Sequence, residues 1–99
     1  MTLPAADPAR VEKLAMANRI LFDQGVVDGF GHISVRHDKS PDHFLLSCNR
    51  APGLVRPEDI LSYGLNGDLA VLSDKRSYVE RFIHSEIYRV VVKFFRTVR

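Results

Sequence analysis

A carboxylate and an imidazole stand four residues apart between positions 78 and 88 of this 99-residue chain. Apolar residues recur at helical spacing through this stretch, which predicts an amphipathic helix. Residues four apart lie one turn apart on the same helix face, so Glu80 and His84 are expected to be neighbours. Partial burial beside Phe82 and Ile83 would raise the pKa of Glu80. The alternative is a surface carboxylate paired with His84 or Arg81, which is the commoner use of this spacing.

The elements that must position this pair follow from capping, spacing and turn signals. A helix is predicted from Asp7-Pro8, an N-cap followed by a proline at the first helical position, up to Gly25. Its buried face is expected to be apolar except for Asn18. Four strands in two hairpins are predicted next, the second around Asn66-Gly67. They cover residues 32–36, 43–47, 60–65 and 68–72.

This order of elements predicts an α/β fold, in which helices are layered on a largely antiparallel sheet. In the first strand, Ile33 and Val35 are expected to face inward. The sheet would be unfinished at this length, and an open edge strand favours association or aggregation. His37 and His43 flank the first turn and are expected to be solvated rather than to share a metal.

Composition narrows the possible classes of protein. The length suits one small domain, and 45% hydrophobic with 26% charged residues is ordinary for a globular chain. No apolar run is long enough to span a membrane, and the first residues do not resemble a secretory leader. Cys48, the single cysteine, cannot form an internal disulfide and fits a reducing compartment. We therefore expect a cytoplasmic location.

The net charge of +2 belongs to the C-terminal segment. Residues 89–99 hold four basic residues and no acid, whereas residues 1–88 hold ten basic and twelve acidic residues, a net charge of −2. A basic tail can contact nucleic acid or anionic lipid. We favour the simpler interpretation that the tail differs in character from the rest, with neither nucleic acid nor membrane as a partner.

Five blocks of the chain, in the right order and with matching spacing, resemble the N-terminal half of the class II aldolase/adducin family. The resemblance covers about residues 10–88. It implies an N-terminal extension over residues 1–9 and a divergent basic tail over residues 89–99. The blocks are residues 17–21, 25–36, 44–47, 51–60 and 78–88.

The resemblance implies a function. The family includes sugar-phosphate aldolases, a ribulose-phosphate epimerase, dehydratases, decarboxylases and the cytoskeletal adducins. Its enzymes share a divalent metal, usually zinc, that takes up the negative charge developing when a bond next to a carbonyl breaks. A metal-dependent lyase acting on a small hydroxy-carbonyl substrate, either sugar-phosphate-like or a carboxylate, is therefore expected, in a homo-oligomer.

The resemblance also assigns roles. Glu80 matches the family's acid/base glutamate, which can also approach the metal when no substrate is bound. His84 does not match a metal ligand and is expected to orient Glu80 through a hydrogen bond. Cys48 is interpreted as structural, because only Arg50 stands close enough in sequence to activate it.

Two further segments match anion-binding loops of the family. Gly29, Gly31 and His32 match the loop that holds the substrate's phosphate or carboxylate, where glycine lets backbone N–H groups approach an anion. Asn49 and Arg50 match a second loop and could donate to the same group. The sugar-phosphate aldolases commonly carry Asn where His32 stands, which indicates another anion or another branch of the family. Without the resemblance, the glycines would simply turn the chain into a strand and the second loop would be polar surface.

The chain departs from the family after Tyr88. There the family continues to a His-x-His pair that holds the metal, with a third histidine further on, whereas residues 89–99 contain no His, Cys, Asp or Glu. Glu80 and His84 supply at most two ligands, and zinc needs three or four. We therefore expect this chain to be inactive and not to bind zinc stably.

Three origins remain open: a truncated or frameshifted product, which we favour, a fragment of a longer protein, or a short form that binds full-length partners. Two other functions also remain open. Like the adducins, the chain could be a non-catalytic assembly module, or it could be a remnant that folds poorly.

Overall fold

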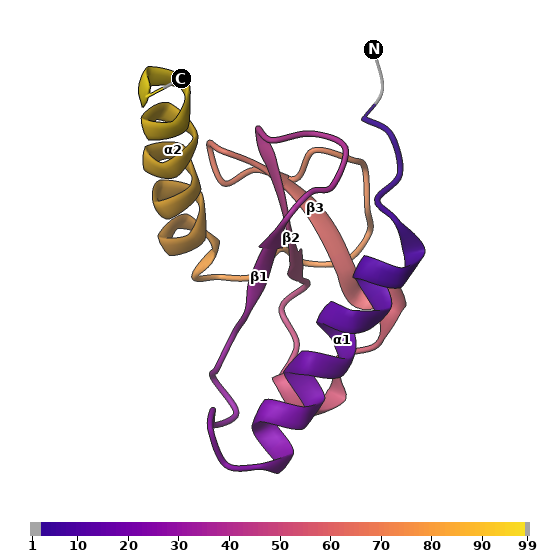
Figure 1. The fold of residues 1–99 in the computed structure, drawn as a ribbon. Helices are drawn as coiled ribbons and strands as arrows, with labels where there is room; N and C mark the ends of the chain where they lie inside the picture. The colour runs from indigo at the N-terminus through magenta and orange to yellow at the C-terminus, as the bar shows by residue number, and fades with distance from the viewer. Residues whose placement is uncertain (1–2, 99) are drawn as a thin grey trace.

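Two helices enclose a three-stranded antiparallel sheet in the computed structural model, which describes residues 3–98 and the side chains of residues 3–90. Helices α1 and α2 lie on either side of the sheet, whose strand order is β1-β2-β3 (Figure 1). This confirms the predicted α/β fold with an antiparallel sheet. The elements are α1 Pro8–Asp23, β1 Ser34–Arg36, β2 His43–Ser47, β3 Ile60–Gly64 and α2 Arg81–Val98, with 3-10 turns at Pro52–Leu54 and Pro57–Asp59.

Helix α1 begins and ends as its capping signals predict. The Asp7 side chain accepts a hydrogen bond from the backbone N–H two residues on, at 3.1 Å, and Pro8 occupies the first helical position. Gly25 follows the helix with φ +74°, a left-handed conformation that glycine adopts at little cost. Asn18 is buried on the inner face, and its side-chain nitrogen donates to the Leu14 carbonyl at 2.9 Å.

The sheet has a different environment on each face. Phe44 of β2 pairs with Tyr63 of β3, and the two rings stack with centroids 5.4 Å apart on the α2 side. Leu45, the next residue along β2, points to the opposite side because successive strand residues alternate. The buried cluster on the α2 side comprises Phe44, Leu46, Tyr63 and Tyr78. Residues that follow each other along one strand therefore reach either helix layer.

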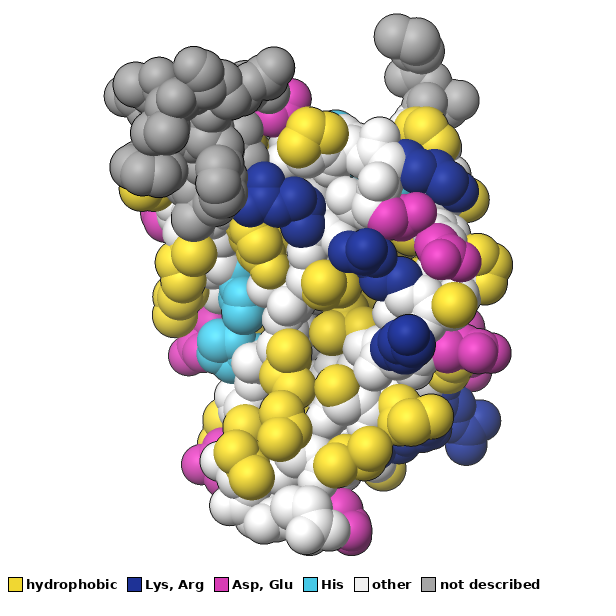
Figure 2. Space-filling model, in the orientation of Figure 1, with side chains coloured by type: hydrophobic (Ala, Val, Ile, Leu, Met, Phe, Trp, Pro, Cys, Tyr) yellow, Lys and Arg dark blue, Asp and Glu magenta, His cyan; other side chains and the backbone are white. Residues whose placement is uncertain are grey.

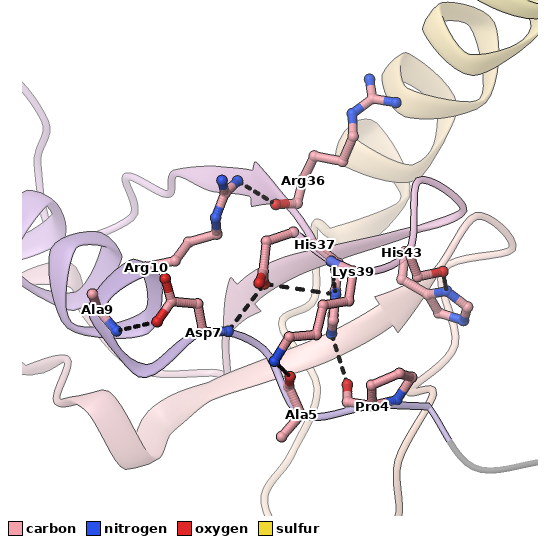
Figure 3. A network of polar contacts seen from close by, with 11 residues as sticks. Pro4, Ala5, Asp7, Ala9, Arg10, Arg36, His37, Lys39 and His43 are labelled. Carbon is pink, nitrogen blue, oxygen red and sulfur yellow. Dashed lines mark hydrogen bonds and ion pairs between the residues drawn. The ribbon is translucent and has the colours of Figure 1, made fainter.

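Three consecutive side chains of the turn after β1 hold the segment before α1, an arrangement we name the N-terminal clasp (Figure 3). His37 is 2% exposed because residues 4–7 fold back over it, so the prediction of a solvated turn histidine was wrong. Its Nδ1 accepts from the Lys39 N–H at 3.0 Å, so Nε2 carries the proton. The clasp contacts are His37 Nε2 to Pro4 O at 3.0 Å, Lys39 Nζ to Ala5 O at 2.7 Å, and Asp7 N to Asp38 Oδ1 at 3.0 Å.

The second hairpin is shorter than predicted. Gly67 turns the chain with φ +88°, as the Asn66-Gly67 signal predicts, but residues 68–72 form only an isolated bridge between Tyr63 and Leu69. The chain then leaves β3, because the Lys75 ammonium donates to the buried Asp59 carboxylate at 3.3 Å. This path brings residues 76–78 back beside the end of β2 and towards the start of α2.

Helix α2 starts three residues later than the predicted segment, at Arg81, and continues beyond it to Val98. The predicted apolar stripe lies on its outer side, where Figure 2 shows hydrophobic side chains along the helix. Its members are Val79, Phe82, Ile83 and Ile87, each about half exposed or more. The inner side instead carries the half-buried His84 and Tyr88 and the buried Ser85, and both aromatic rings of this set stack on Phe44. None of the helices described between residues 3 and 98 is long and apolar enough to cross a bilayer.

Candidate functional site

The glycine-containing loop before β1 is a compact turn. Gly31 N donates to Asp28 O at 3.0 Å, and Phe30 N donates to the Asp28 side chain at 2.9 Å. A Cβ atom at Gly31 would collide with the Val27 side chain, so the turn requires glycine at this position. Around Gly29 the space is open, and a ligand can therefore approach the backbone there.

Tyr78 fixes this turn to the sheet. Its hydroxyl donates to Phe30 O at 3.0 Å and lies 3.3 Å from Gly31 O, while its backbone N–H donates to the Tyr63 hydroxyl at 3.0 Å. The Tyr63 hydroxyl in turn donates to Ser47 O at 3.0 Å. Burial raises the pKa of both phenols, so both stay protonated donors. The two loops thus keep fixed positions relative to β2 and β3.

The second loop leaves β2 at residues 49–51. Asn49 N donates to Arg76 O at 2.8 Å, and Arg50 Nε lies 3.5 Å from an Asp59 carboxylate oxygen. Burial raises the pKa of Asp59, but a hydrogen bond from Arg56 N and the charges of Lys75 and Arg50 outweigh it and lower the pKa overall. Asp59 is therefore ionised and anchors Arg50 through Nε, while the side chain stays 44% exposed towards a ligand.

These loops and the start of α2 enclose a pocket of about 360 Å³. Four of the six predicted site residues line it: Gly29, Asn49, Arg50 and Glu80. The other two, Gly31 and His32, lie directly behind it, since Gly31 O contacts Tyr78 and the His32 ring contacts Glu80. Segments 20 to 30 residues apart in sequence thus meet at one place. The full lining is Gly29, Phe30, Asn49, Arg50, Ala51, Tyr78, Val79 and Glu80.

Glu80 is connected to the interior by a hydrogen-bonded series of five side chains. His32 Nε2 lies 2.8 Å from Glu80 Oε2, and His32 Nδ1 lies 2.5 Å from His84 Nε2. His84 Nδ1 then lies 2.6 Å from Ser34 Oγ, which lies 2.8 Å from the Tyr88 hydroxyl. The predicted neighbours Glu80 and His84 are thus joined through the ring of His32, because Glu80 precedes the helix rather than lying within its first turn. In Figure 2, histidine side chains reach the surface beside an acidic one next to α2.

Burial of His84 lowers its pKa to about 4; the neighbouring His32 adds to this, and the charge of Glu80 partly opposes it. At neutral pH the ring is therefore uncharged, with one nitrogen as a donor and the other as an acceptor. The series is then made of neutral rings and hydroxyls that end on the carboxyl group of Glu80.

The residues described between 3 and 98 contain no group of three or more His, Cys, Asp or Glu placed to hold a metal ion. Both nitrogens of His32 are engaged, one with Glu80 and the other with His84, so their lone pairs do not converge on a common point. These residues do not by themselves fit the family's divalent metal.

Three residues of the site were missed by the sequence analysis: Ser34, Tyr78 and Tyr88. Two signals point to Ser34 and Tyr88. Ser34 alternates with Ile33 and Val35, which places it on the same strand face as His32. Tyr88 stands four residues after His84, on the same helix face. No local signal predicts that Tyr78 fixes the glycine loop, because its partners lie 47 and 48 residues away.

Comparison with known proteins agrees with this architecture. The model of the class II aldolase and adducin N-terminal domain matches residues 12–94, so the chain belongs to this family. This confirms the resemblance drawn from the sequence. A curated relative, decarboxylase tropJ of Talaromyces stipitatus, is 38% identical over 91 residues, which cover 90% of this chain and 34% of that protein.

Solved structures share the fold. An aldolase II superfamily protein from Pseudomonas syringae superposes with a TM-score of 0.73 at 20% identity, covering 88% of this chain and 36% of that one. L-fuculose 1-phosphate aldolase from Glaciozyma antarctica superposes with a TM-score of 0.69 at 21% identity, covering 91% and 41%. The chain thus spans about a third of the length of the curated relative that it matches.

Proposed function

We propose that this chain forms the anion-binding and acid/base part of a class II aldolase-type lyase that acts on a small hydroxy-carbonyl compound. One observation carries the proposal. Glu80 lies in the same pocket as the backbone of Gly29 and the side chains of Asn49 and Arg50. A carboxyl group beside a cation and an open glycine backbone suits a substrate with one anionic end and one reacting carbon.

The anionic end is a carboxylate under this proposal. The guanidinium of Arg50 matches a carboxylate with two parallel hydrogen bonds, and its anchoring by Asp59 through Nε fixes its direction. His32 stands where the family's sugar-phosphate aldolases commonly carry Asn. The 38% identity with a decarboxylase also supports a carboxylate substrate.

In this arrangement Arg50 and the Gly29 backbone hold the anion, which orients the rest of the substrate towards Glu80. Glu80 takes a proton from the substrate or returns one next to its carbonyl, and its 54% exposed side chain can reach into the pocket. The family's divalent metal supplies Lewis-acid stabilisation of developing negative charge. Since the described residues do not fit that metal, no step is assigned through it. The chain alone is expected to bind the anion without turning the substrate over.

Binding of a small hydroxy acid tests the proposal. Glycolate is titrated into the labelled chain, followed by backbone amide NMR shifts, with inorganic phosphate in a parallel titration. We expect saturable shifts at Gly29, Asn49 and Arg50, with glycolate binding tighter than phosphate. Arg50→Ala should weaken binding roughly tenfold or more, because a charge-assisted hydrogen bond is lost.

The matched control is Arg19→Ala, an exposed arginine of α1 outside the pocket, which should bind like the unaltered chain. Equal binding by the Arg50→Ala variant, or shifts confined to other surfaces, would overturn the proposal. Tighter binding of phosphate would replace the carboxylate by a phosphate-bearing substrate. Turnover of a hydroxy-carbonyl compound by the chain with added zinc would contradict the expected inactivity.

A second candidate function is a non-catalytic, adducin-like assembly module. The exposed apolar side of α2 favours it, since contiguous apolar surface commonly marks contact between proteins. A defined oligomer that shows no anion binding at the pocket would support this candidate over the lyase.

A further inference from the structure

The hydrogen-bonded series behind Glu80 contains two imidazoles whose four ring nitrogens all have a partner. His32 contacts Glu80 and His84, and His84 contacts His32 and Ser34. Each neutral imidazole has one N–H and one lone pair, so choosing the donor at one nitrogen fixes the other. The tautomers of the two rings are therefore not independent of each other.

The ends of the series decide its direction. At one end an ionised Glu80 can only accept, so it requires an N–H at His32 Nε2. His32 Nδ1 then has a lone pair and must accept from an N–H at His84 Nε2. His84 Nδ1 consequently accepts from the Ser34 hydroxyl. Hydrogen donation runs from Tyr88 through Ser34, His84 and His32 to Glu80 without a conflict at any contact.

The opposite direction fails at the pocket. If His84 carried its proton on Nδ1, its Nε2 lone pair would require an N–H at His32 Nδ1. His32 Nε2 would then point a lone pair at Glu80 Oε2 from 2.8 Å, which repels an ionised carboxylate. Ser34 at the far end favours the productive direction, since its hydroxyl is oriented by the Tyr88 hydroxyl at 2.8 Å.

We propose that Ser34 and His84 are positioning residues that set the tautomer of His32, so that His32 presents an N–H to Glu80. This inference rests on the proposed role of Glu80. The bond from His32 restrains one oxygen of a side chain that precedes α2 and is otherwise half exposed, leaving the other oxygen for the substrate. Neither Ser34 nor His84 lines the pocket, so both act through His32.

The tautomers can be measured directly in the intact 99-residue chain. Nitrogen-15 labelling of the imidazoles and long-range proton–nitrogen correlations near pH 7.5 distinguish Nε2–H from Nδ1–H rings. We expect His32 and His84 both as Nε2–H. In Ser34→Ala, the donor to His84 Nδ1 is lost, and His32 and His84 should both shift towards a mixture with Nδ1–H.

Two further variants separate this effect from general damage. Ser34→Thr keeps the hydroxyl on the same strand and should restore the Nε2–H signals, whereas Ser62→Ala removes a hydroxyl from β3 outside the series and should change neither ring. Well-dispersed backbone amide signals identify variants that remain folded. If Ser34→Ala does not fold, Ser34→Thr and the tautomers of the unaltered chain still decide the matter.

The inference is overturned if His32 in the unaltered chain is Nδ1–H, or if folded Ser34→Ala leaves both rings unchanged. Because this readout needs no ligand, it is independent of the anion titration. Nε2–H tautomers together with absent glycolate binding would refute the proposed function while leaving the positioning intact. The reverse result would refute only the positioning.

Discussion

The ring of His84 links the chemistry of the pocket to the stability of the fold. Its pKa falls to about 4 from an ordinary 6.5, mainly because it is buried between β2 and α2. In the unfolded chain the ring takes up a proton at a higher pH than in the folded chain. The stabilising contribution is therefore complete above about pH 6.5 and is lost as the pH falls towards 4.

We predict that the free energy of unfolding decreases between about pH 6.5 and pH 4. The slope from His84 is at most about 1.4 kcal/mol per pH unit, and smaller in practice because the ring is only partly buried. Urea denaturation near pH 7 and near pH 5 measures it. In His84→Gln, which has no titrating ring, the difference between the two pH values should shrink. An equal difference in both chains would contradict the assignment.

At this scale, the residues predicted to form the site were found by their resemblance to family motifs, not by local periodicity. Spacing alone predicted a direct contact between Glu80 and His84, whereas His32 lies between them. The reason is that contacts across 48 to 54 residues join β1 to α2, and no periodic pattern within one segment encodes such a pairing. Ser34 and Tyr88 enter the site by the same long-range packing.

Among the elements, α1 follows most directly from local signals. Its N-cap, first-turn proline and following glycine all act as local rules require. Tertiary packing then adds a contact that these rules omit, since the backbone N–H of the same Asp7 also joins the N-terminal clasp. The helix start is thus fixed both from within the helix and from the turn after β1 (Figure 3).

We predict that Asp7→Ala lowers stability by about 1 kcal/mol, because the first turn loses its side-chain acceptor while the backbone contact remains. For a chain of this size, the melting temperature should fall by about 4–8 °C, as followed by circular dichroism. Asp7→Asn retains an acceptor oxygen and is the matched control. A loss of equal size in the Asn variant would show that charge, rather than capping, is responsible.

The last helix shows where pattern stops being sufficient. Its apolar stripe was identified correctly as a stripe, but Ile83 and Ile87 lie on the solvent side. Periodicity reports that one face differs from the other, and it does not report which face meets the sheet. Here the sheet is met by side chains that stack on Phe44 and extend the hydrogen-bonded series, namely His84 and Tyr88.

Considered as a whole, the molecule has the dimensions of a folded protein of its length. Its radius of gyration is 13.2 Å, and a compact domain of 100 residues has about 13 Å. We therefore predict a single, sharp thermal transition with coincident midpoints from circular dichroism and NMR. A broad transition whose midpoint depends on the probe would favour a poorly folding remnant instead.

The outer side of α2 leads to a prediction about assembly. Ile83, Ile87 and Val90 repeat at helical spacing and are each more than half exposed. Burying such a stripe against a second copy removes apolar surface from water, so the chain should associate as its concentration rises. Sedimentation velocity over a range of concentrations measures this.

The double substitution Ile83→Glu with Ile87→Glu should shift the chain towards the monomer, because charge cannot be buried in an apolar contact. Met16→Glu, at an exposed position of α1, is the control and should associate like the unaltered chain. Unchanged association of the double variant would exclude this side of α2 as the contact.

The chain contains three tyrosines and no tryptophan, and all three phenols take part in the architecture of the pocket. Tyr63 and Tyr78 bond to backbone carbonyls, and Tyr88 ends the hydrogen-bonded series. The intrinsic ultraviolet fluorescence of this protein therefore arises entirely from the walls and support of one site. A fluorescence change on mixing with a ligand, without any attached dye, would report on that site and on no other part of the surface.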